Sequence, residues 1–330
     1  MDILFIGGTR FVGRAMAEVA ARRGHAVTVL HRGRNTPETL TSVEHLTADR
    51  DGDLSVLDGR SFDATVDVCA YVPRQVDSLA RALDGRGGHH VFISTMSVYA
   101  DTDEPGLTES GALVRLDDPT TEEVTEETYG GLKVLCEEAA QAAYGDGLTI
   151  IRPTYVVGPH DPTGRFTWWV RRIARGGDVV APGPADSPIQ LVDARDQAEW
   201  AIDLVEGRVT GIYNGVGSEP PFGFGDMLEA TVAAVGPPGT QLVWMDGDWL
   251  KQQGETYQTL PLWVEGGVEW LMASDPSAAF ATGLRPRPLV ETVADTLTWI
   301  QSEQPPEVEG WGISAEHEAE LLTAWRTSRS

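Results

Sequence analysis

Three glycines near the start of the chain constrain its fold more than any other feature of the sequence. Residues 2–6, DILFI, predict a short buried strand, and GGTRFVG follows it directly. A helix with one apolar face is predicted over residues 14–23. Glycine at Gly7 and Gly8 lets a backbone approach a pyrophosphate, and Gly13 lets the helix pack close to the strand. This order predicts a dinucleotide-binding turn.

The alternation of strands and helices continues through the first half of the chain. Further buried strands are predicted at residues 26–30, 43–46, 64–68, 90–93 and 148–151, with helices at residues 74–84 and 129–144. Strands rich in valine and isoleucine that alternate with helices pair in parallel and carry helices on both faces. The sequence therefore predicts an α/β fold, a Rossmann-like doubly wound parallel sheet with a smaller C-terminal substrate lobe.

Composition indicates where these two parts divide. All ten tryptophans lie after residue 165. We therefore expect a dinucleotide-binding domain over residues 1–160 and a substrate-binding lobe over residues 161–330. A strand near 188–192 and a helix over 194–206 follow, and the segments near 188–215 are expected to return to the first domain.

Charge and hydropathy argue against several classes of partner. The net charge is −25, and only two of the 25 basic residues are lysines, which argues against a nucleic-acid partner because phosphates are held by basic side chains. No apolar run approaches the roughly 18 residues of a membrane span, and no secretory signal is evident. We therefore expect a cytoplasmic protein with a small-molecule substrate, as a homodimer or a monomer. The acidic surface could also reflect adaptation to a salt-rich cytoplasm, and the sequence leaves this alternative open.

The end of the second predicted strand indicates which dinucleotide binds. A free ribose 2′-hydroxyl is commonly held there by a carboxylate, whereas a 2′-phosphate needs a cation. The residues are His31, Arg32 and Arg34, with no carboxylate, and Arg10 in the glycine turn can close on the same phosphate. The other turn residues expected in the cofactor site are Thr9, Phe11 and Val12. The sequence therefore favours NADP, with NAD possible.

Two further positions are expected beside the adenosine. Asp49 follows the third predicted strand and can accept a hydrogen bond from the adenine amino group. Ala70 follows the fourth strand, and its small side chain leaves room for the cofactor.

A tyrosine and a lysine four residues apart suggest the chemistry. Tyr129 and Lys133 share one face of a predicted helix. A phenol with a pKa near 10 is a poor base at neutral pH, so Lys133 is expected to lower that pKa and to bind the nicotinamide ribose. A hydroxyl at the end of the fifth strand can orient the substrate oxygen. Thr95 is the first choice, with Ser94 and Ser97 behind it.

Five motifs together resemble the extended short-chain dehydrogenases/reductases of the NAD-dependent epimerase/dehydratase family. They are GGTRFVG, ISTMSVYA, YGGLK, RPTYVVGP and QLVDARD, and they span roughly residues 1–215. The resemblance implies a catalytic triad of Thr95, Tyr129 and Lys133, hydride transfer at C4 of the nicotinamide, and a substrate cleft between the two lobes.

The chain also departs from the family pattern. Arg10 replaces a glycine, which resembles an atypical branch with GGTRF turns. Tyr155 stands where nucleotide-sugar enzymes of the family usually have asparagine, which puts such a substrate in doubt. Met96 and Ser97 stand where the dehydratases have Asp and Glu, so elimination of water by that route is not expected.

The substrate-contacting candidates come from both halves of the chain. They are Ser97, Tyr155, His160 and Arg165. His160 is either an added acid or base or an ordinary loop histidine. None of the seven histidines has a metal-ligand spacing, so no metal is expected.

Three functions compete at this point. The first is an NAD(P)-dependent oxidoreductase in which Tyr129 exchanges a proton with a hydroxyl or carbonyl substrate. The second is a sugar or nucleotide-sugar epimerase that keeps its NAD bound. The third is a non-catalytic relative that senses a nucleotide or binds RNA.

Overall fold

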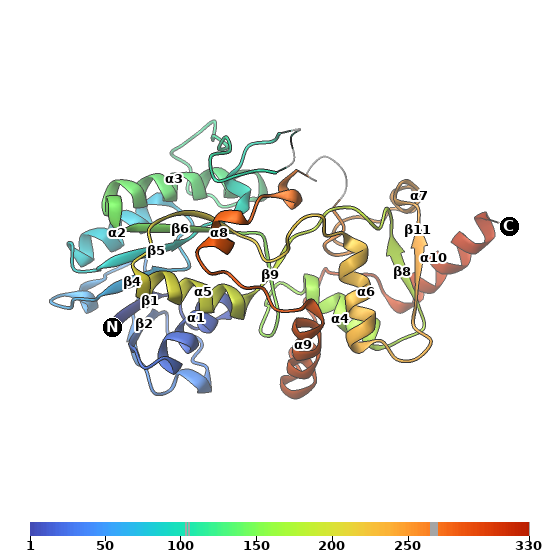
Figure 1. Cartoon of the computed structure of the whole chain (residues 1–330), viewed down its shortest axis with the longest axis horizontal. Coiled ribbons are helices and arrows are strands. Elements are labelled where there is room, and N and C mark those ends of the chain that lie inside the picture. Colours follow the sequence, from blue (N-terminus) through green and yellow to red (C-terminus); the bar gives the residue numbers. More distant parts are fainter. Residues whose placement is uncertain (103, 105, 265–269, 330) are drawn as a thin grey trace.

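A seven-stranded parallel sheet forms the first of two lobes in the computed structural model, which describes residues 1–102, 104, 106–264 and 270–329 (Figure 1). In spatial order the strands are β10 (Gly211–Gly215), β6 (Leu148–Pro153), β5 (His89–Ile93), β4 (Ala64–Asp67), β1 (Asp2–Ile6), β2 (Ala26–His31) and β3 (Glu44–Thr47). All neighbouring pairs are parallel. The predicted doubly wound α/β fold is confirmed.

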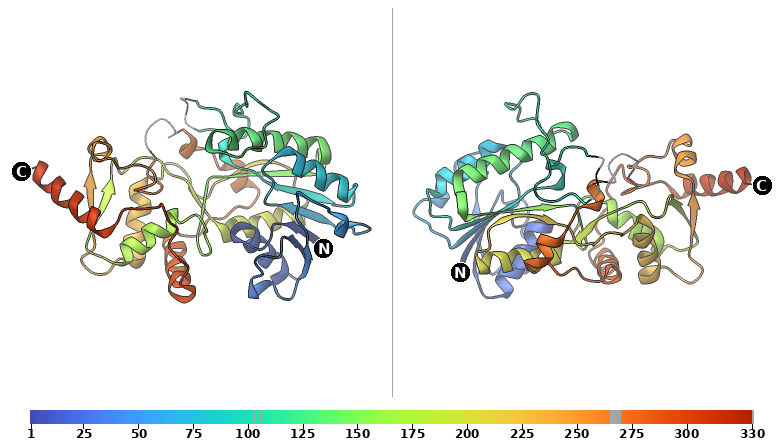
Figure 2. Two further views of the ribbon diagram at one scale, coloured as in Figure 1. Left: turned by 180° about the vertical axis from the view of Figure 1, so that it is seen from behind. Right: turned by 45° about the horizontal axis from the view of Figure 1, so that its top comes forward.

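Helices cover both faces of this sheet (Figures 1 and 2). On one face α1 (Phe11–Arg22) packs against α5 (Ala194–Gly207), and on the other α2 (Pro73–Leu83) packs against α3 (Glu126–Tyr144). The strand order reverses between β1 and β4, and ligands of such sheets bind at the carboxyl ends of the strands beside this switch point. The turn after β1 therefore lies at the same edge of the sheet as the end of β4, which neighbours β1, and the end of β5, which neighbours β4.

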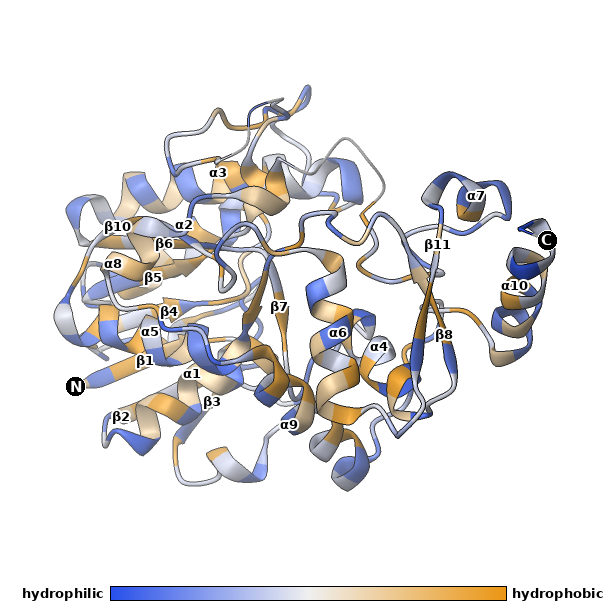
Figure 3. Cartoon of the chain, turned by 45° about the vertical axis from the view of Figure 1, so that its right-hand side comes forward, coloured by the Kyte–Doolittle hydropathy of each residue, from blue (hydrophilic) through white to orange (hydrophobic). Residues whose placement is uncertain are grey.

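The second lobe is smaller and has its own core. Its elements are α4 (Arg165–Ala174), β8 (Asp178–Pro182), α6 (Phe224–Val235), β11 (Gln241–Met245), α7 (Gly247–Gln252), α9 (Leu289–Glu303) and α10 (Ala315–Ser328). Helix α6 packs against α4 and α9, and Phe166, Trp169 and Phe224 are buried between them. Figure 3 shows hydrophobic residues along α4 and α6, as a helix packed on its neighbours requires.

Part of the chain after residue 188 returns to the sheet lobe. Strand β9 (Leu191–Asp193) leads into α5, and β10 then pairs with β6 at the sheet edge. The strand predicted near 188–192 is shorter than expected and pairs with β7 (Tyr155–Val157), because β10 occupies the place beside β6.

The short helices are α8 (Ser277–Ala281) and the 3₁₀ turns η1 (Glu38–Leu40), η2 (Ser55–Leu57), η3 (Met96–Val98), η4 (Gly145–Gly147) and η5 (Leu271–Ala273).

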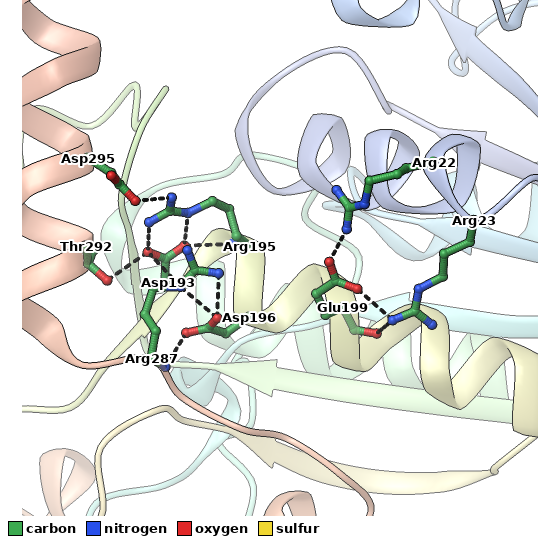
Figure 4. Close-up of polar contacts among 9 residues, drawn as sticks. All are labelled: Arg22, Arg23, Asp193, Arg195, Asp196, Glu199, Arg287, Thr292 and Asp295. Atoms are coloured by element: carbon green, nitrogen blue, oxygen red, sulfur yellow. Dashed lines mark hydrogen bonds and ion pairs between the residues drawn. The ribbon is translucent and has the colours of Figure 1, made fainter.

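Buried ion pairs join the two lobes at the start of α5 (Figure 4). Asp193 caps α5 by accepting from the backbone N–H of Arg195 at 2.8 Å, and it also accepts from the hydroxyl of Thr292 in α9 at 2.8 Å. Arg287 donates to Asp196 at 2.8 Å through both its backbone N–H and its Nε. Asp193 and Asp196 therefore both hold the first turn of α5, Asp193 against Thr292 of α9 and Asp196 against Arg287.

Across residues 1–102, 104, 106–264 and 270–329, no helix is both long and apolar enough to cross a membrane.

Candidate active site

The glycine turn after β1 is shaped by close contacts that only glycine permits. A Cβ on Gly13 would lie 2.5 Å from the carbonyl oxygen of Gly7, so any side chain there would push α1 away from the turn. Gly7 has φ +88° and a Cβ on it would lie 2.7 Å from Sγ of Cys69. Glycine is therefore required at both positions for α1 to begin directly against the end of β1.

The first turn of α1 is open to a negatively charged group. Its N-terminal residue, Arg10, makes no side-chain capping bond, and the turn contains no acidic residue. The unpaired backbone N–H groups and the helix dipole at such an end attract phosphates. Phe11 and Val12 belong to this turn, and the carbonyl of Thr9 accepts from Asn35 at 3.0 Å, which ties the turn to the segment after β2.

At the end of β2 the structure separates three residues that were predicted to act together. His31 is buried, its Nε2 lies 3.0 Å from Nδ1 of His45, and its Nδ1 accepts from the backbone N–H of Gly33. Burial, followed by the neighbouring His45, lowers the pKa of His31. The ring of His31 therefore contacts His45 of β3, and its expected contact with the cofactor stays a prediction. Arg32 and Arg34 are exposed.

None of the three arginines expected at the 2′-phosphate is neutralised by this chain. Within the described residues the side chains of Arg10, Arg32 and Arg34 form no ion pair and no hydrogen bond, and all three residues are exposed. The charge of Arg10 reaches Tyr71, where it lowers the pKa against the larger effect of burial. These guanidinium groups are therefore available to an anion.

The ends of β3 and β4 hold a buried charge pair that the sequence did not reveal. Asp49 is exposed, and its carboxylate accepts from the backbone N–H of Asp51 at 3.1 Å. The next residue, Arg50, is buried and donates to both oxygens of Asp67, at 2.7 and 2.9 Å. Ala70 is fully buried, and its expected place beside the cofactor stays a prediction.

The two glycines after Tyr129 explain how α3 reaches the end of β5. A Cβ on Gly130 would lie 2.2 Å from the carbonyl oxygen of Ser97, and one on Gly131 would lie 2.4 Å from Cγ of Leu116. Without side chains at these positions, α3 packs directly on the segment after β5. The structure thereby brings Tyr129 to Thr95, as the sequence suggested.

Tyr129 and Thr95 interact, and their neighbours set the state of the phenol. Burial raises the pKa of Tyr129. The hydrogen bond with Thr95 and the charge of Arg165 lower this pKa, but their effect is smaller than that of burial. The Thr95 hydroxyl also accepts from the backbone N–H of Ser97 at 3.1 Å and donates to its Oγ at 3.2 Å. The ring of Tyr71 lies 6.4 Å from the ring of Tyr129. The phenol is therefore protonated at neutral pH.

The side chain of Lys133 is buried, and its ammonium group is held by two backbone carbonyls. Its Nζ is buried and donates to the carbonyls of Ala70 and Ile93, both at 2.8 Å, and it lies 4.2 Å from the ring centre of Phe92. Burial lowers the pKa of the ammonium group. Arg165 is a cation whose charge acts on the Tyr129 phenol in this structure, and the expectation that Lys133 lowers this pKa stays a prediction.

Two substrate candidates, Tyr155 and Arg165, lie together. The guanidinium of Arg165 lies 4.9 Å from the ring centre of Tyr155, and its Nη1 donates to the hydroxyl of Tyr257 at 3.1 Å. Tyr257 in turn packs edge-on against Trp311. No sequence signal pointed to Tyr257, whereas Tyr71 directly follows Ala70 at the end of β4 and could have been found from that position.

His160 lies apart from this group. Its Nδ1 is 3.2 Å from Nη1 of Arg14 in α1, and its ring packs against Trp299 in α9. Burial, then the charge of Arg14, lowers its pKa. The structure therefore makes His160 a contact between α1 and α9, and it does not support the added acid or base. The described residues contain no cluster of three or more His, Cys, Asp or Glu side chains suited to a metal ion.

A doubly wound sheet, a glycine turn after its first strand and a tyrosine–lysine helix define a Rossmann-like protein of the short-chain dehydrogenase/reductase type. The chain belongs to the NAD-dependent epimerase/dehydratase family, whose model matches residues 3–214. The resemblance predicted from the five motifs is confirmed, and so is the prediction of an NAD-dependent enzyme class at the level of the family.

One curated relative and two solved structures are similar to this chain. The chain is 25% identical over 259 residues to the chloroplast stem-loop binding protein of 41 kDa b of Arabidopsis thaliana, a match that covers 73% of this chain and 65% of the relative's length. The enzyme WbmH of Bordetella bronchiseptica, solved with NAD⁺, superposes with a TM-score of 0.68 at 16% identity, covering 91% of this chain and 98% of that one.

The UDP-glucuronic acid 4-epimerase of Bacillus cereus, solved with NAD, superposes with a TM-score of 0.65 at 16% identity over 92% of this chain and 100% of that one. At such identities these two likenesses establish the fold.

Proposed function

We propose that this chain is an oxidoreductase that reduces a small carbonyl compound with NADP as its hydride carrier. The observation that carries the proposal is the meeting of Tyr129 and Thr95 at the end of β5, beside the glycine turn. Family membership supports a nicotinamide cofactor. The unpaired arginines after β2 support the 2′-phosphate form.

The residues of the turn fit a dinucleotide. Backbone N–H groups of the first turn of α1 receive the pyrophosphate, and Gly7 and Gly13 leave no side chain in its way. Arg32 and Arg34, with Arg10 from the turn, bind the 2′-phosphate. Lys133 uses two of its three N–H groups on backbone carbonyls, and the third is left for a ribose hydroxyl.

Tyr129 acts as the proton donor. When bound, the dinucleotide supplies a hydride at C4 of its nicotinamide. The Tyr129 phenol, kept protonated by its raised pKa, donates its proton to the substrate oxygen as the carbonyl carbon is reduced, and Thr95 holds that oxygen by a hydrogen bond. Arg165 then stabilises the phenolate until solvent returns the proton. A protonated Tyr129 is thus better suited to act as the acid in carbonyl reduction than as the base in alcohol oxidation.

A second candidate is the epimerase that retains its NAD, and the fold it shares with an NAD-bound 4-epimerase favours it. The two functions differ in what happens to the cofactor. A reductase given NADPH and a panel of aldehydes and ketones oxidises NADPH in proportion to the product formed, which the near-ultraviolet absorbance of the reduced nicotinamide reports. We expect that result.

The opposite result would replace the proposal. If the purified protein releases stoichiometric NAD on denaturation and interconverts sugar epimers without net change in absorbance, the epimerase is correct. RNA binding, the property in the name of the plant relative, is disfavoured by the net charge of −25.

Charge reversal at Arg32 and Arg34 tests the choice of cofactor. The double change Arg32→Glu and Arg34→Glu is expected to weaken NADPH binding by about tenfold or more, because each hydrogen bond between charged groups contributes roughly 1.5–3 kcal/mol. NADH binding should be unchanged or stronger. Calorimetric titration measures both. The matched control is Arg175→Glu, an exposed arginine of the second lobe, and equal losses in both proteins would contradict the assignment.

A further inference from the structure

An arginine without a carboxylate partner stands beside the proton donor. Arg165 is the first residue of α4 and is partly buried. Its Nη1 donates to the hydroxyl of Tyr257 at 3.1 Å, its Nε donates to Oγ1 of Thr163 at 3.3 Å, and its guanidinium lies over the ring of Tyr155. All these partners are neutral. They orient the guanidinium group without cancelling its charge.

Comparable arginines of this chain are neutralised. Arg152 pairs with Glu137 at 2.6 Å, and Arg172, on the same helix as Arg165, pairs with Glu318 at 2.5 Å. The chain has 50 acidic and 25 basic residues, so carboxylates are abundant. Within the described residues Arg165 nevertheless forms no ion pair, and its Nη2 makes no hydrogen bond. Its unused donors point to a partner from outside the chain.

The charge of Arg165 acts on the carboxyl of Asp161, but the two side chains form no ion pair. Oδ1 of Asp161 accepts from the backbone N–H of Thr163 at 2.8 Å, and no ion pair joins Asp161 to Arg165. Burial raises the pKa of the Asp161 carboxyl, and the hydrogen bonds from Thr163 and the charge of Arg165 oppose that rise. Asp161 therefore takes none of the N–H groups of Arg165.

The position of Arg165 relates it to the reaction. Its charge lowers the pKa of the Tyr129 phenol and of the Tyr155 phenol, in both cases against the larger effect of burial. Tyr155 also supplies the aromatic face on which the guanidinium rests. The guanidinium of Arg165 is therefore near enough to Tyr129 to influence its phenol electrostatically.

We propose that Arg165, oriented by Tyr155 and Tyr257, binds an anionic group of the substrate, a carboxylate or a phosphate, close to the carbonyl that reacts at Tyr129. The planar fork of guanidinium N–H groups matches the paired oxygens of either anion. The substrate class is then an oxo acid or a phosphorylated carbonyl compound. The link to the reaction rests on the proposed function, whereas binding of the anion does not.

Anion binding to the NADP-loaded protein tests this directly. The probes are malonate and inorganic phosphate, titrated by calorimetry. The native protein is expected to bind one of them, and Arg165→Gln is expected to weaken that binding about tenfold or more, since a charge-assisted hydrogen bond is lost. Tyr257→Phe should weaken it by a smaller factor. Arg175→Gln, which removes the same charge from the C-terminal end of α4, should leave it unchanged.

Each outcome has a distinct meaning. Preference for malonate identifies a carboxylate, and preference for phosphate identifies a phosphorylated substrate. Equal binding by the native protein and Arg165→Gln, or no binding of either anion, overturns the proposal. Should Arg165→Gln not fold, Arg165→Lys keeps the charge without the fork and still must weaken binding. Arg165-dependent anion binding in a protein that never oxidises NADPH would remove the proposed function while leaving this site in place.

Discussion

Tyr129→Phe is expected to lower kcat for carbonyl reduction by about 10²- to 10⁴-fold, the usual contribution of a general acid. The change removes one oxygen, the atom that is to give its proton to the substrate and that interacts with Thr95. NADPH affinity should be unaffected, because no cofactor contact is assigned to the phenol. Steady-state kinetics together with calorimetric binding of NADPH separates the two effects.

A neighbouring tyrosine provides the control for this substitution. Tyr71 lies 6.4 Å from Tyr129 between ring centres and is 46% exposed, so Tyr71→Phe removes the same atom from the same surroundings. We expect that variant to retain activity. A Tyr129→Phe protein that turns over as fast as the Tyr71→Phe protein would show that the proton comes from another group.

Glu137→Leu is expected to destabilise the fold by about 3–5 kcal/mol, the usual effect of leaving one member of a buried ion pair alone. Glu137 accepts from Arg152 at 3.0 and 2.6 Å, and Arg152 is 1% exposed. Arg152 also donates to the hydroxyl of Tyr99, which donates to Asn214 in β10. Loss of the carboxylate would leave a guanidinium charge inside this network. Urea unfolding followed by circular dichroism measures the change.

Two comparisons show whether the isolated charge causes this loss. The double change Glu137→Leu with Arg152→Met removes both charges and is expected to restore most of the stability. Glu138→Leu alters the adjacent residue, which forms an exposed ion pair with Arg115, and should change stability by less than about 1 kcal/mol. If Glu137→Leu is no more harmful than Glu138→Leu, the buried network contributes little.

Local signals in the sequence predicted the sheet, the glycine turn and the helix of Tyr129 well. The strand expected at residues 2–6 is β1, and the helix expected at residues 129–144 is α3, which begins three residues earlier because Thr125 caps it through Thr128. These features depend on neighbours in the chain, where residue type and spacing carry the information.

Features that depend on distant residues could not be predicted in the same way. His31 contacts His45 of β3, and the pairing of β2 with β3 decides that contact. Arg165 meets Tyr257, which is 92 positions away in the chain and lies in no recognisable motif. Lys133 was expected beside Tyr129, but its Nζ reaches two strand-end carbonyls that no sequence pattern marks.

The contacts that Asp193 makes with α5 and α9 also limit how the two lobes can move. Asp193 holds the backbone of Arg195 and the side chain of Thr292, and Arg195 reaches Asp295 at 2.6 Å, so α5 and α9 are tied at several points close to one another. A wide hinge rotation about this point would break all of these bonds at once. Shear, in which packed helices slide by small amounts, can leave them intact. We therefore expect substrate capture to involve small adjustments around Arg165 and Tyr257, with the lobes keeping their relative orientation.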